Sequence, residues 1–357
     1  MTPDPTTLPV TLAQPREAGA DAGHRRGPLR IAIYALITAA TIAFAYLALH
    51  SVHFNQVWHA LRYSNYVWLI PALAVFAAAT MARALRWHAL FAPDRRPPLG
   101  AVTNAMLVGY LFNNIMPARA GEAARVVTLT QRAGTPAAEA LGTVVVERVF
   151  DVLSILIVFF AAAPWLPHVS WFGAAELVAV ALAVALTTVI VVLAVYGDRP
   201  LHFVMRPLGR LPGLSVEKVQ RLGQELVDGL HGLRRPRVAL AAFGWSISAW
   251  VLSSLSAWLV TFAFNLHLGL DAGVLVTVAV GAGMILPSPP AAVGVFEAAV
   301  LLAMQAYGFD QTKALPFALI LHMVNFLPFL LAGVLALQYN ATIRRRRGRL
   351  EALEGTT

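Results

Sequence analysis

The sequence predicts an all-α fold: a polytopic membrane helix bundle with about six full spans and two re-entrant hairpins. Only 13% of its residues are charged and 58% are hydrophobic, whereas a soluble domain carries about 25% charged residues. The hydrophobic residues also gather in long blocks, and a membrane span needs about 20 of them in a row. The blocks that meet or approach this length are 31–49, 171–195, 239–264 and 315–337.

The charge balance and the lack of cysteine exclude several classes of function. The formal net charge is +9, but the basic residues lie mainly in a few connecting segments, as the positive-inside rule predicts for membrane proteins. We therefore expect contact with anionic lipid and not with nucleic acid. Without cysteine there is no disulfide or thiolate site. The sequence also lacks the common phosphate-loop, zinc-protease and nucleophile-elbow motifs, so we predict no cofactor, no metal site and no catalytic residue.

The basic segments define the orientation of the chain. The positive-inside rule places them in the cytoplasm, and they are residues 1–30, 83–96, 197–237 and 344–349. Segments with little or no positive charge are predicted outside, and they are 51–65, 161–170 and 265–271. Both termini are then cytoplasmic, and we expect a multi-pass protein of the bacterial inner membrane. Arg83 and Arg86, at the end of the second span, are expected to snorkel to the inner interface.

The number of crossings between these segments requires two hairpins. Two apolar blocks lie between the inside segment at Arg95 and the outside segment at Pro164, yet the number of crossings there must be odd. We interpret 100–135 as a hairpin that enters and leaves on the cytoplasmic side, followed by a full span at 137–160. By the same reasoning 272–306 is a hairpin that enters from outside. Ordinary short spans joined by kinks are the alternative, which hydropathy does not distinguish.

The two halves of the chain then share one order of elements: span, span, hairpin, span. Each half has three crossings, so the second is predicted to be inverted relative to the first, as in many transporters. The predicted organisation is a disordered cytoplasmic tail (1–29), a transmembrane domain (30–338) and a basic cytoplasmic tail (339–357). Within the domain the halves are 30–162 and 171–338, and an amphipathic linker at 198–237 lies on the inner leaflet.

Polar residues around the tip of the first hairpin form the first candidate site. Pro117 breaks the helix, so the freed backbone groups and the nearby amides need partners or water. A guanidinium can bind a lipid phosphate through two hydrogen bonds, and a carboxylate suits the start of the following helix. The candidates for substrate binding are Asn113, Asn114, Arg119, Glu122 and Arg125. The two arginines are also compatible with orientation charges in the inner interface.

Three ionisable residues, Glu147, Arg148 and Asp151, lie within the predicted span 137–160. A charge at the bilayer centre costs at least ~2.5–3.5 kcal/mol, so these side chains should point into the bundle. They are compatible with a headgroup site or a proton relay. The alternative is a buried ion-pair network that fastens this span to a hairpin, with Arg119 or Arg125 as the partner, and the two readings can coexist.

The tip of the second hairpin contains three prolines within 287–290, which exclude a continuous helix. Glu297 then falls in the first turns of the returning half-helix, where free N–H groups suit an anion or a polar headgroup. A plain turn at the membrane surface is the alternative. His322 and Asn325 interrupt the last span, and we expect them to form interhelical hydrogen bonds and not a site.

Together these motifs resemble the transmembrane domain of the lysylphosphatidylglycerol synthase family, also described as flippase-like membrane proteins. The stretches that carry the resemblance are 111–125, 143–151 and 287–297, and it extends over most of 31–338. In that family the domain is associated with moving aminoacylated phosphatidylglycerol between leaflets. A separate cytosolic domain performs the aminoacyl transfer, and we expect it to be missing here. One departure is Ala291-Ala292, where relatives usually carry a Gly-Gly pair.

The leading hypothesis is a protein that translocates or handles a polar-headgroup lipid between leaflets. In it, Arg119 and Arg125 bind phosphate, while Glu122, Glu147, Asp151 and Glu297 meet a cationic or hydroxyl-bearing headgroup. The expected partners are membrane lipids, either an anionic or aminoacylated phospholipid or an isoprenoid lipid, and a lipid-synthesis enzyme. Two other functions stay open. One is an intramembrane enzyme that modifies an aminoacyl- or glycosyl-lipid, with Glu147 or Asp151 as general base, and the other is a non-transporting scaffold for envelope biogenesis.

Overall fold

The computed structural model describes residues 54–116, 120–167, 235–284 and 290–354, with a few positions between 177 and 188. Several predicted features fall outside the described residues: the tail 1–29, the first span, most of the block 171–195 and of the linker 198–237, Arg119, and residues 287–289. Within the described ranges every regular element is helical, with no strand. The predicted all-α bundle is confirmed.

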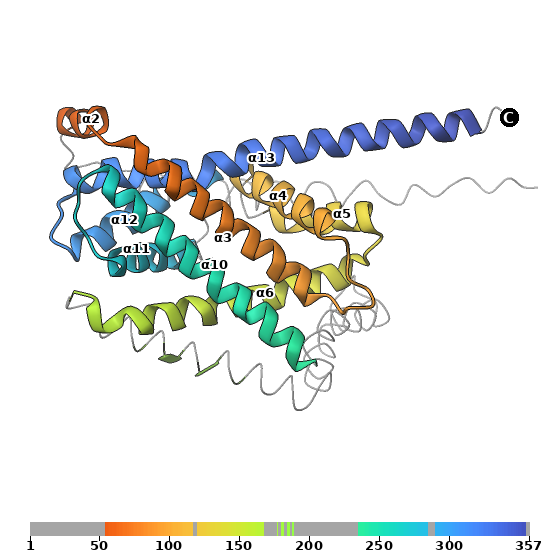
Figure 1. The fold of residues 1–357 in the computed structure, drawn as a ribbon, viewed down its shortest axis with the longest axis horizontal. Coiled ribbons are helices and arrows are strands. Elements are labelled where there is room, and N and C mark those ends of the chain that lie inside the picture. Colours follow the sequence, from red (N-terminus) through yellow and green to blue (C-terminus); the bar gives the residue numbers. More distant parts are fainter. Residues whose placement is uncertain are drawn as a thin grey trace, which may run out of the picture.

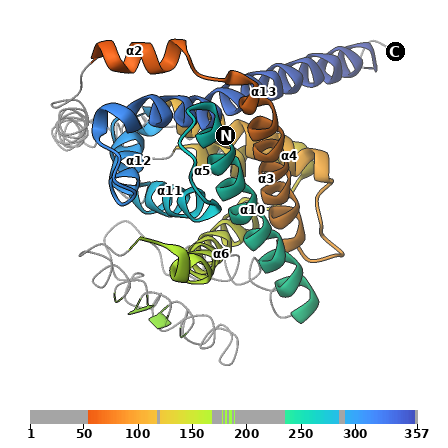
Figure 2. The same cartoon turned by 60° about the vertical axis from the view of Figure 1, so that its left-hand side comes forward.

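The helices are described by halves. The first half contains α2 (Phe54–Arg62), η2 (Tyr66–Trp68), α3 (Leu69–Leu90), α4 (Leu99–Ile115), α5 (Gly121–Ala133), α6 (Ala137–Ala162) and η4 (Ala163–Trp165). The second half contains α10 (Pro236–Ala263), α11 (Leu270–Gly283), η6 (Pro290–Ala292), α12 (Val295–Gln305) and α13 (Gln311–Glu354). Figures 1 and 2 both show α13 extending well past the other helices toward the C-terminus.

Helices α3 and α10 lie side by side along their length (Figure 1). Just before α3, the N–H of Asn65 donates to the carbonyl of Ala263 at the end of α10, at 2.9 Å. Near the end of α3, Arg86 donates to Ser246, early in α10, at 3.0 Å. The two helices are therefore antiparallel. Both buried faces are rich in alanine, which lets helix backbones approach closely in a membrane; the fully buried alanines include Ala72, Ala79, Ala242 and Ala249.

Helices α4 and α5 form the helical hairpin expected at 100–135. They pack against each other, and their 17 and 13 residues are fewer than the about 20 that a span requires. Gly134 ends α5 with a φ of 69°, a left-handed conformation that glycine adopts without steric cost. Pro136 then precedes α6 with a φ of −55°. The turn back into α6 is thus built from glycine and proline.

Helices α11 and α12 form the second hairpin, with 14 and 11 residues. Near its tip, Ala291 and Ala292 have φ values of 58° and 56°. These are the positions where the resemblance noted above implies two glycines, and the chain has a left-handed backbone there in spite of the side chains. A left-handed alanine costs about 1–2 kcal/mol, so the tip of this hairpin is strained.

The two halves repeat one packing pattern. Helix α4 packs on α13, while its counterpart α11 packs on α6, and each hairpin also packs on the helix that follows it. Two large apolar cores each draw residues from both halves, with Trp87, Leu129 and Ala242 fully buried in one and Ala72, Val300 and Phe317 in the other. A duplicated unit produces such a repeated packing pattern, and the inverted repeat remains our interpretation of it.

Among the described residues, three helices are long and apolar enough to cross a membrane, at Tyr66–Leu90, Pro236–Ala263 and Gln311–Ile343. Helix α6 has 26 residues and is therefore about 39 Å long, more than the about 30 Å thickness of the hydrocarbon core. It differs from the other three in carrying charged residues along its length. The hairpin helices are shorter, which agrees with segments that turn back within the bilayer.

Re-entry of the hairpins can be tested by labelling, because the chain contains no native cysteine. We expect Gly100→Cys and Ala137→Cys, both exposed at the two ends of the first hairpin, to react with an impermeant maleimide from one and the same side. Leu270→Cys and Gln305→Cys, also exposed, should react from the opposite side. Labelling of Gly100→Cys and Ala137→Cys from different sides would show that the first hairpin crosses the membrane.

The strain at Ala291 and Ala292 can be tested by glycine substitution. We expect either change to glycine to raise the apparent melting temperature in detergent by a few degrees, since glycine removes a cost of about 1–2 kcal/mol. Ala298→Gly, inside α12, is the matched control and should lower stability by about 0.5–1 kcal/mol. Equal destabilisation by all three changes would mean that the left-handed backbone carries no strain.

Candidate functional site

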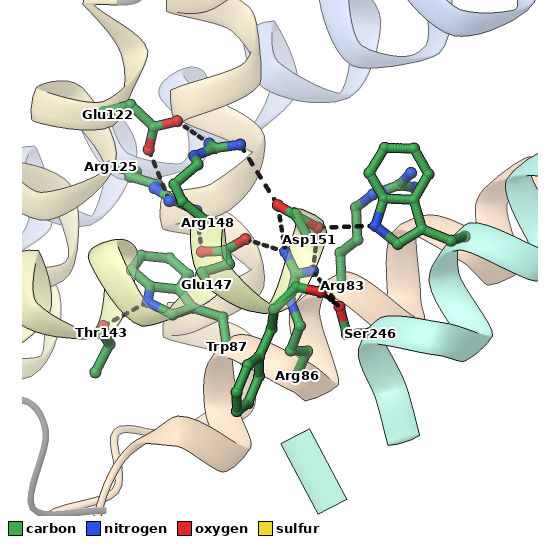
Figure 3. A network of polar contacts seen from close by, with 12 residues as sticks. Arg83, Arg86, Trp87, Glu122, Arg125, Thr143, Glu147, Arg148, Asp151 and Ser246 are labelled. Atoms are coloured by element: carbon green, nitrogen blue, oxygen red, sulfur yellow. Dashed lines mark hydrogen bonds and ion pairs between the residues drawn. The ribbon is translucent and has the colours of Figure 1, made fainter. Parts of the chain in front are cut away.

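Six ionised side chains from three helices meet at the point where the first hairpin contacts α3 and α6 (Figure 3). Their ion pairs form one connected network, with members Arg86 on α3, Glu122 and Arg125 on α5, and Glu147, Arg148 and Asp151 on α6. Five of the nine predicted site residues are therefore brought together. Arg86 is a member that the sequence reading did not include among them.

Glu147 is the centre of the network. Its side chain is only 2% exposed and is paired with Arg86 on one oxygen and with Arg125 at 2.8 Å on the other. A buried carboxylate is tolerated only when opposite charges and hydrogen bonds compensate its lost hydration, and two guanidinium groups do so here. Glu147 therefore connects α6 both to α3 and to α5, as the ion-pair reading of the sequence proposed.

Aromatic and hydroxyl groups hold these guanidinium groups in place. The guanidinium of Arg125 lies over the Trp87 ring, 4.8 Å from its centre, at a distance where cation–π attraction operates. The Trp87 indole N–H in turn donates to the Thr143 hydroxyl at 2.9 Å. Arg86 also donates to Ser246. Helices α3, α6 and α10 thus all contribute to orienting the arginines.

Asp151 receives donors from three helices. Arg86 approaches one of its oxygens at 2.5 Å, the indole N–H of Trp250 on α10 lies 3.1 Å from the same atom, and Arg148 lies 3.5 Å from the other oxygen. The side chain is 15% exposed. Asp151 therefore lies between the closed interior of the network and its accessible edge.

The accessible edge consists of Glu122, Arg148 and Asp151. Glu122 pairs with Arg125 at 2.6 Å and also with Arg148. The side chain of Arg148 is 47% exposed and that of Glu122 is 23% exposed, so the pair is accessible from outside the bundle. Exposed pairs exchange partners at little cost, in contrast to the enclosed pairs around Glu147. The network therefore has a fixed interior and an exchangeable edge.

The six charges balance, but a seventh charged side chain, a cation, lies next to them (Figure 3). Arg83, one turn before Arg86 on α3, donates to Ser253 at 2.7 Å. Its other terminal nitrogen is buried and has no hydrogen-bond partner among the described residues, and the same holds for the amide nitrogen of Asn114. The network and Arg83 together thus carry an excess of one positive charge, an arrangement that favours an anion.

The hairpin tip is positioned by a close approach of α4 and α5. A Cβ atom on Gly109 would lie 2.8 Å from the Cβ of Arg125 and 3.0 Å from the carbonyl of Gly121, so only glycine fits there. Asn113 accepts a hydrogen bond from the N–H of Gly121 at 2.9 Å. Asn113 was predicted to contact substrate, and its observed bond instead caps the start of α5, which places Glu122 and Arg125 toward α6.

The prediction that Arg86 snorkels to the inner interface is wrong. Its side chain is 1% exposed and is enclosed by Glu147, Asp151 and Ser246. The sequence contained one signal for this pairing. Arg83 and Arg86, three positions apart, share a helix face, and the apolar block 137–160 contains two carboxylates four positions apart. Which helix lies opposite Arg86 is, however, set only by the tertiary packing.

Glu297 belongs to a second polar group on the other hairpin. One of its oxygens accepts the N–H of Gly294 at 2.7 Å, and the other lies 2.6 Å from Nδ1 of His322 on α13. Nε2 of His322 lies 2.9 Å from the carbonyl of Ala291. The interhelical contact expected of His322 is confirmed. The amide nitrogen of Asn325 instead donates to the carbonyl of Leu321 within α13, at 2.8 Å. This nitrogen therefore does not form the predicted interhelical bond.

The interior and the edge of the network should differ in their contribution to stability. We expect Glu147→Ala to lower the free energy of unfolding by about 3–5 kcal/mol, because it leaves two buried guanidinium groups undercompensated. Arg148→Ala at the exposed edge should cost less than about 1 kcal/mol. Thermal unfolding of both variants in the same detergent measures the difference, and similar losses in the two would contradict this division.

Comparisons with known proteins place the chain among membrane proteins. The family described as the lysylphosphatidylglycerol synthase TM region matches residues 29–333. The protein named glycosyltransferase AglD of Haloferax volcanii is 26% identical over 340 residues, which cover 85% of this chain and 54% of that relative. The UPF0104 membrane protein MJ1078 of Methanocaldococcus jannaschii is 21% identical over 224 residues, which cover 63% of this chain and 92% of that protein.

The chain thus spans about half the length of the first relative and nearly all of the second. The matched family region, residues 29–333, includes both hairpins, the ion-pair network and the Glu297–His322 pair. Together with the apolar helices, these matches support a multi-pass membrane protein in a lipid-related process. The chain belongs to the lysylphosphatidylglycerol synthase TM region family.

Proposed function

We propose that this protein translocates a lipid with a charged, phosphate-bearing headgroup between the two leaflets. The observation that carries the proposal is the ion-pair network, whose exchangeable edge joins Glu122, at the start of the hairpin helix α5, to Arg148 and Asp151 on α6. Arg148 follows the first residue of α6 by eleven positions, which corresponds to roughly 16 Å along the helix. The edge therefore lies well within the length of a membrane-spanning helix, where a charged headgroup has no other favourable environment.

The edge offers both signs of charge to a headgroup. A phosphate suits the guanidinium of Arg148, which can bind it through two hydrogen bonds. An ammonium group suits the carboxylates of Glu122 and Asp151. When a zwitterionic or aminoacylated headgroup replaces the Arg148–Glu122 pair, each charge keeps an opposite partner and none is left uncompensated in the apolar region. Arg83 and Asn114, with their unused donors, favour additional negative charge on the headgroup, and Arg119, outside the described residues, remains a proposed phosphate ligand.

The interior of the network supports the edge without taking part in the exchange. Both terminal nitrogens of Arg125 face carboxylates, so a phosphate reaches this residue only by displacing one of them. Glu147 is enclosed by two guanidinium groups. We therefore assign Arg86, Arg125 and Glu147 to holding the hairpin tip against α6, and Glu122, Arg148 and Asp151 to meeting the lipid.

The same geometry argues against Glu147 as a general base. A general base needs a free lone pair within hydrogen-bond reach of the reacting proton, whereas both oxygens of Glu147 face cations. A lipid-modifying activity is suggested only by the name of one relative, of which the match covers 54%. A lipid-synthesis enzyme acting beside this protein would supply the substrate that our proposal requires.

Reconstituted vesicles test the proposal. Purified protein in proteoliposomes should move a headgroup-intact, tail-labelled aminoacylated phosphatidylglycerol between leaflets, measured as the fraction protected from an impermeant quencher. Arg148→Ala should slow this movement about tenfold, equivalent to about 1.4 kcal/mol, since the phosphate loses its partner at the edge.

Lys313→Ala is the matched control, because Lys313 is also an exposed helix cation, 69% accessible and paired only loosely with Asp310 at 3.8 Å. It should leave the rate unchanged. A rate that equals that of protein-free vesicles, or that is the same in Arg148→Ala as in wild type, would count against translocation at this edge. A new lipid species formed in the vesicles would point instead to an enzyme.

A further inference from the structure

Both ring nitrogens of His322 face hydrogen-bond acceptors. Nε2 lies 2.9 Å from the carbonyl oxygen of Ala291, and Nδ1 lies 2.6 Å from a carboxylate oxygen of Glu297. A carbonyl oxygen has no proton to donate, so Nε2 carries one. A neutral imidazole has only one N–H, and Nδ1 would then present a lone pair to the carboxylate oxygen.

The short contact between Nδ1 and the carboxylate therefore requires one more proton. That proton lies between Nδ1 and the facing oxygen, whichever of the two atoms holds it. The second oxygen of Glu297 accepts the N–H of Gly294 at 2.7 Å, so the proton is not placed there. The side chains of His322 and Glu297 are 12% and 9% exposed, and water can exchange this proton with the solution.

Other charged groups do not neutralise the pair. The ionisable residues on the described elements packed against α13 or η6 are His59 and Arg62 on α2, Arg83, Arg86 and His88 on α3, Tyr110 on α4, Arg237 on α10 and Glu297 on α12. Of these, only Glu297 forms an ion pair with His322 among the described residues. Phe296 stacks on the imidazole at 4.4 Å between ring centres. The charge state of the pair thus depends on its own proton.

The corresponding contact in the first hairpin has a permanent charge. Glu122 at the start of α5 pairs with Arg148, 26 residues later, and Glu297 at the start of α12 pairs with His322, 25 residues later. Arg148 and His322 each follow the first residue of their helix by eleven positions. An arginine stays charged at all physiological pH values, whereas a histidine titrates within that range. Only the second hairpin is therefore fastened by a removable charge.

We propose that Glu297 and His322 form a proton-binding site that fastens the second hairpin to α13 when it is occupied and couples lipid translocation to a proton. The coupling rests on the proposed function, and the proton site itself does not. When the pair loses its proton to water, the neutral imidazole keeps a single N–H, so one ring nitrogen turns a lone pair toward its acceptor, either the Glu297 carboxylate or the Ala291 carbonyl, and that contact becomes repulsive. The hairpin tip, whose left-handed backbone includes Ala291, then loses one of its two contacts with His322.

Two substitutions mimic the proton-occupied and the proton-free state of the Glu297–His322 site. In Glu297→Gln, the amide oxygen still accepts the Gly294 N–H while the amide nitrogen donates to Nδ1, so a neutral imidazole satisfies every contact. This variant should hold the hairpin closed at every pH. His322→Phe preserves the aromatic contact with Phe296 but removes both hydrogen bonds, and it should leave the hairpin loose at every pH. Asn325→Ala, whose native side chain bonds only its own helix, is the matched control.

Spin labelling measures the mobility of the second hairpin independently of lipid transport. Val293 at the hairpin tip is 50% exposed, and the chain has no native cysteine, so Val293→Cys accepts a single nitroxide. In lipid nanodiscs the pH is raised from about 5 to about 9. The ratio of mobile to immobile label should increase with pH as the proton is lost, by up to about tenfold per pH unit for one linked proton. Glu297→Gln should stay immobile, His322→Phe should stay mobile, and Asn325→Ala should titrate like wild type. A wild-type label that does not respond to pH, or a Glu297→Gln label that still does, overturns the proton site.

Lipid translocation in the proteoliposomes described under the proposed function, now with an imposed pH gradient, tests the coupling to a proton. The wild-type rate should respond to the gradient, and the Glu297→Gln rate should not. If the wild type translocates lipid at a rate indifferent to the gradient, the coupling is wrong while the proposed function stands. If no variant moves lipid under any condition, the proposed function fails, and the spin-label titration alone decides the proton-binding site.

Discussion

The structure depends on one buried carboxylate, Glu147, placed between two guanidinium groups. In an apolar environment each of these charges is unfavourable by itself, so the three must stay together. Because Arg86 comes from α3 and Arg125 from the tip of the first hairpin, the requirement brings three separate segments to one point. The interrupted segment, which lacks the length to cross the membrane, is thereby fixed in position by charge as well as by its apolar core residues, such as Met106 and Leu129.

Fixing the hairpin tip in this way leaves Arg148, Glu122 and Asp151 at the accessible edge. Their pairing is weaker because water reaches them, and a lipid headgroup of matching charges can replace it without leaving any ion uncompensated. The enclosed and the exposed parts of the network thus have different tasks. The first maintains the architecture, and the second provides the surface on which our proposed translocation depends.

The two hairpins use the same construction with different chemistry. Each begins its second helix with a glutamate that meets a basic side chain on the following long helix, at nearly equal sequence separation. In the first hairpin the basic group is an arginine inside a larger ion-pair network. In the second it is a histidine with a single charged partner and a strained backbone beside it. Under our proposals, the two hairpins thus carry one permanently charged contact and one whose charge depends on a bound proton.

The sequence by itself determined the fold class, the two hairpins and most of the charged cluster, because hydropathy, proline and ionisable residues within apolar blocks are local properties of the chain. It could not assign Arg86, since an arginine near a helix end snorkels or pairs according to which helix lies opposite. It could not predict that Asn113 accepts the Gly121 N–H at the start of α5, because the close approach at Gly109 that brings the two helices into contact is a tertiary feature. Only the tertiary structure set Glu297 against His322, since hydrogen-bond partners distant in the sequence are chosen by packing.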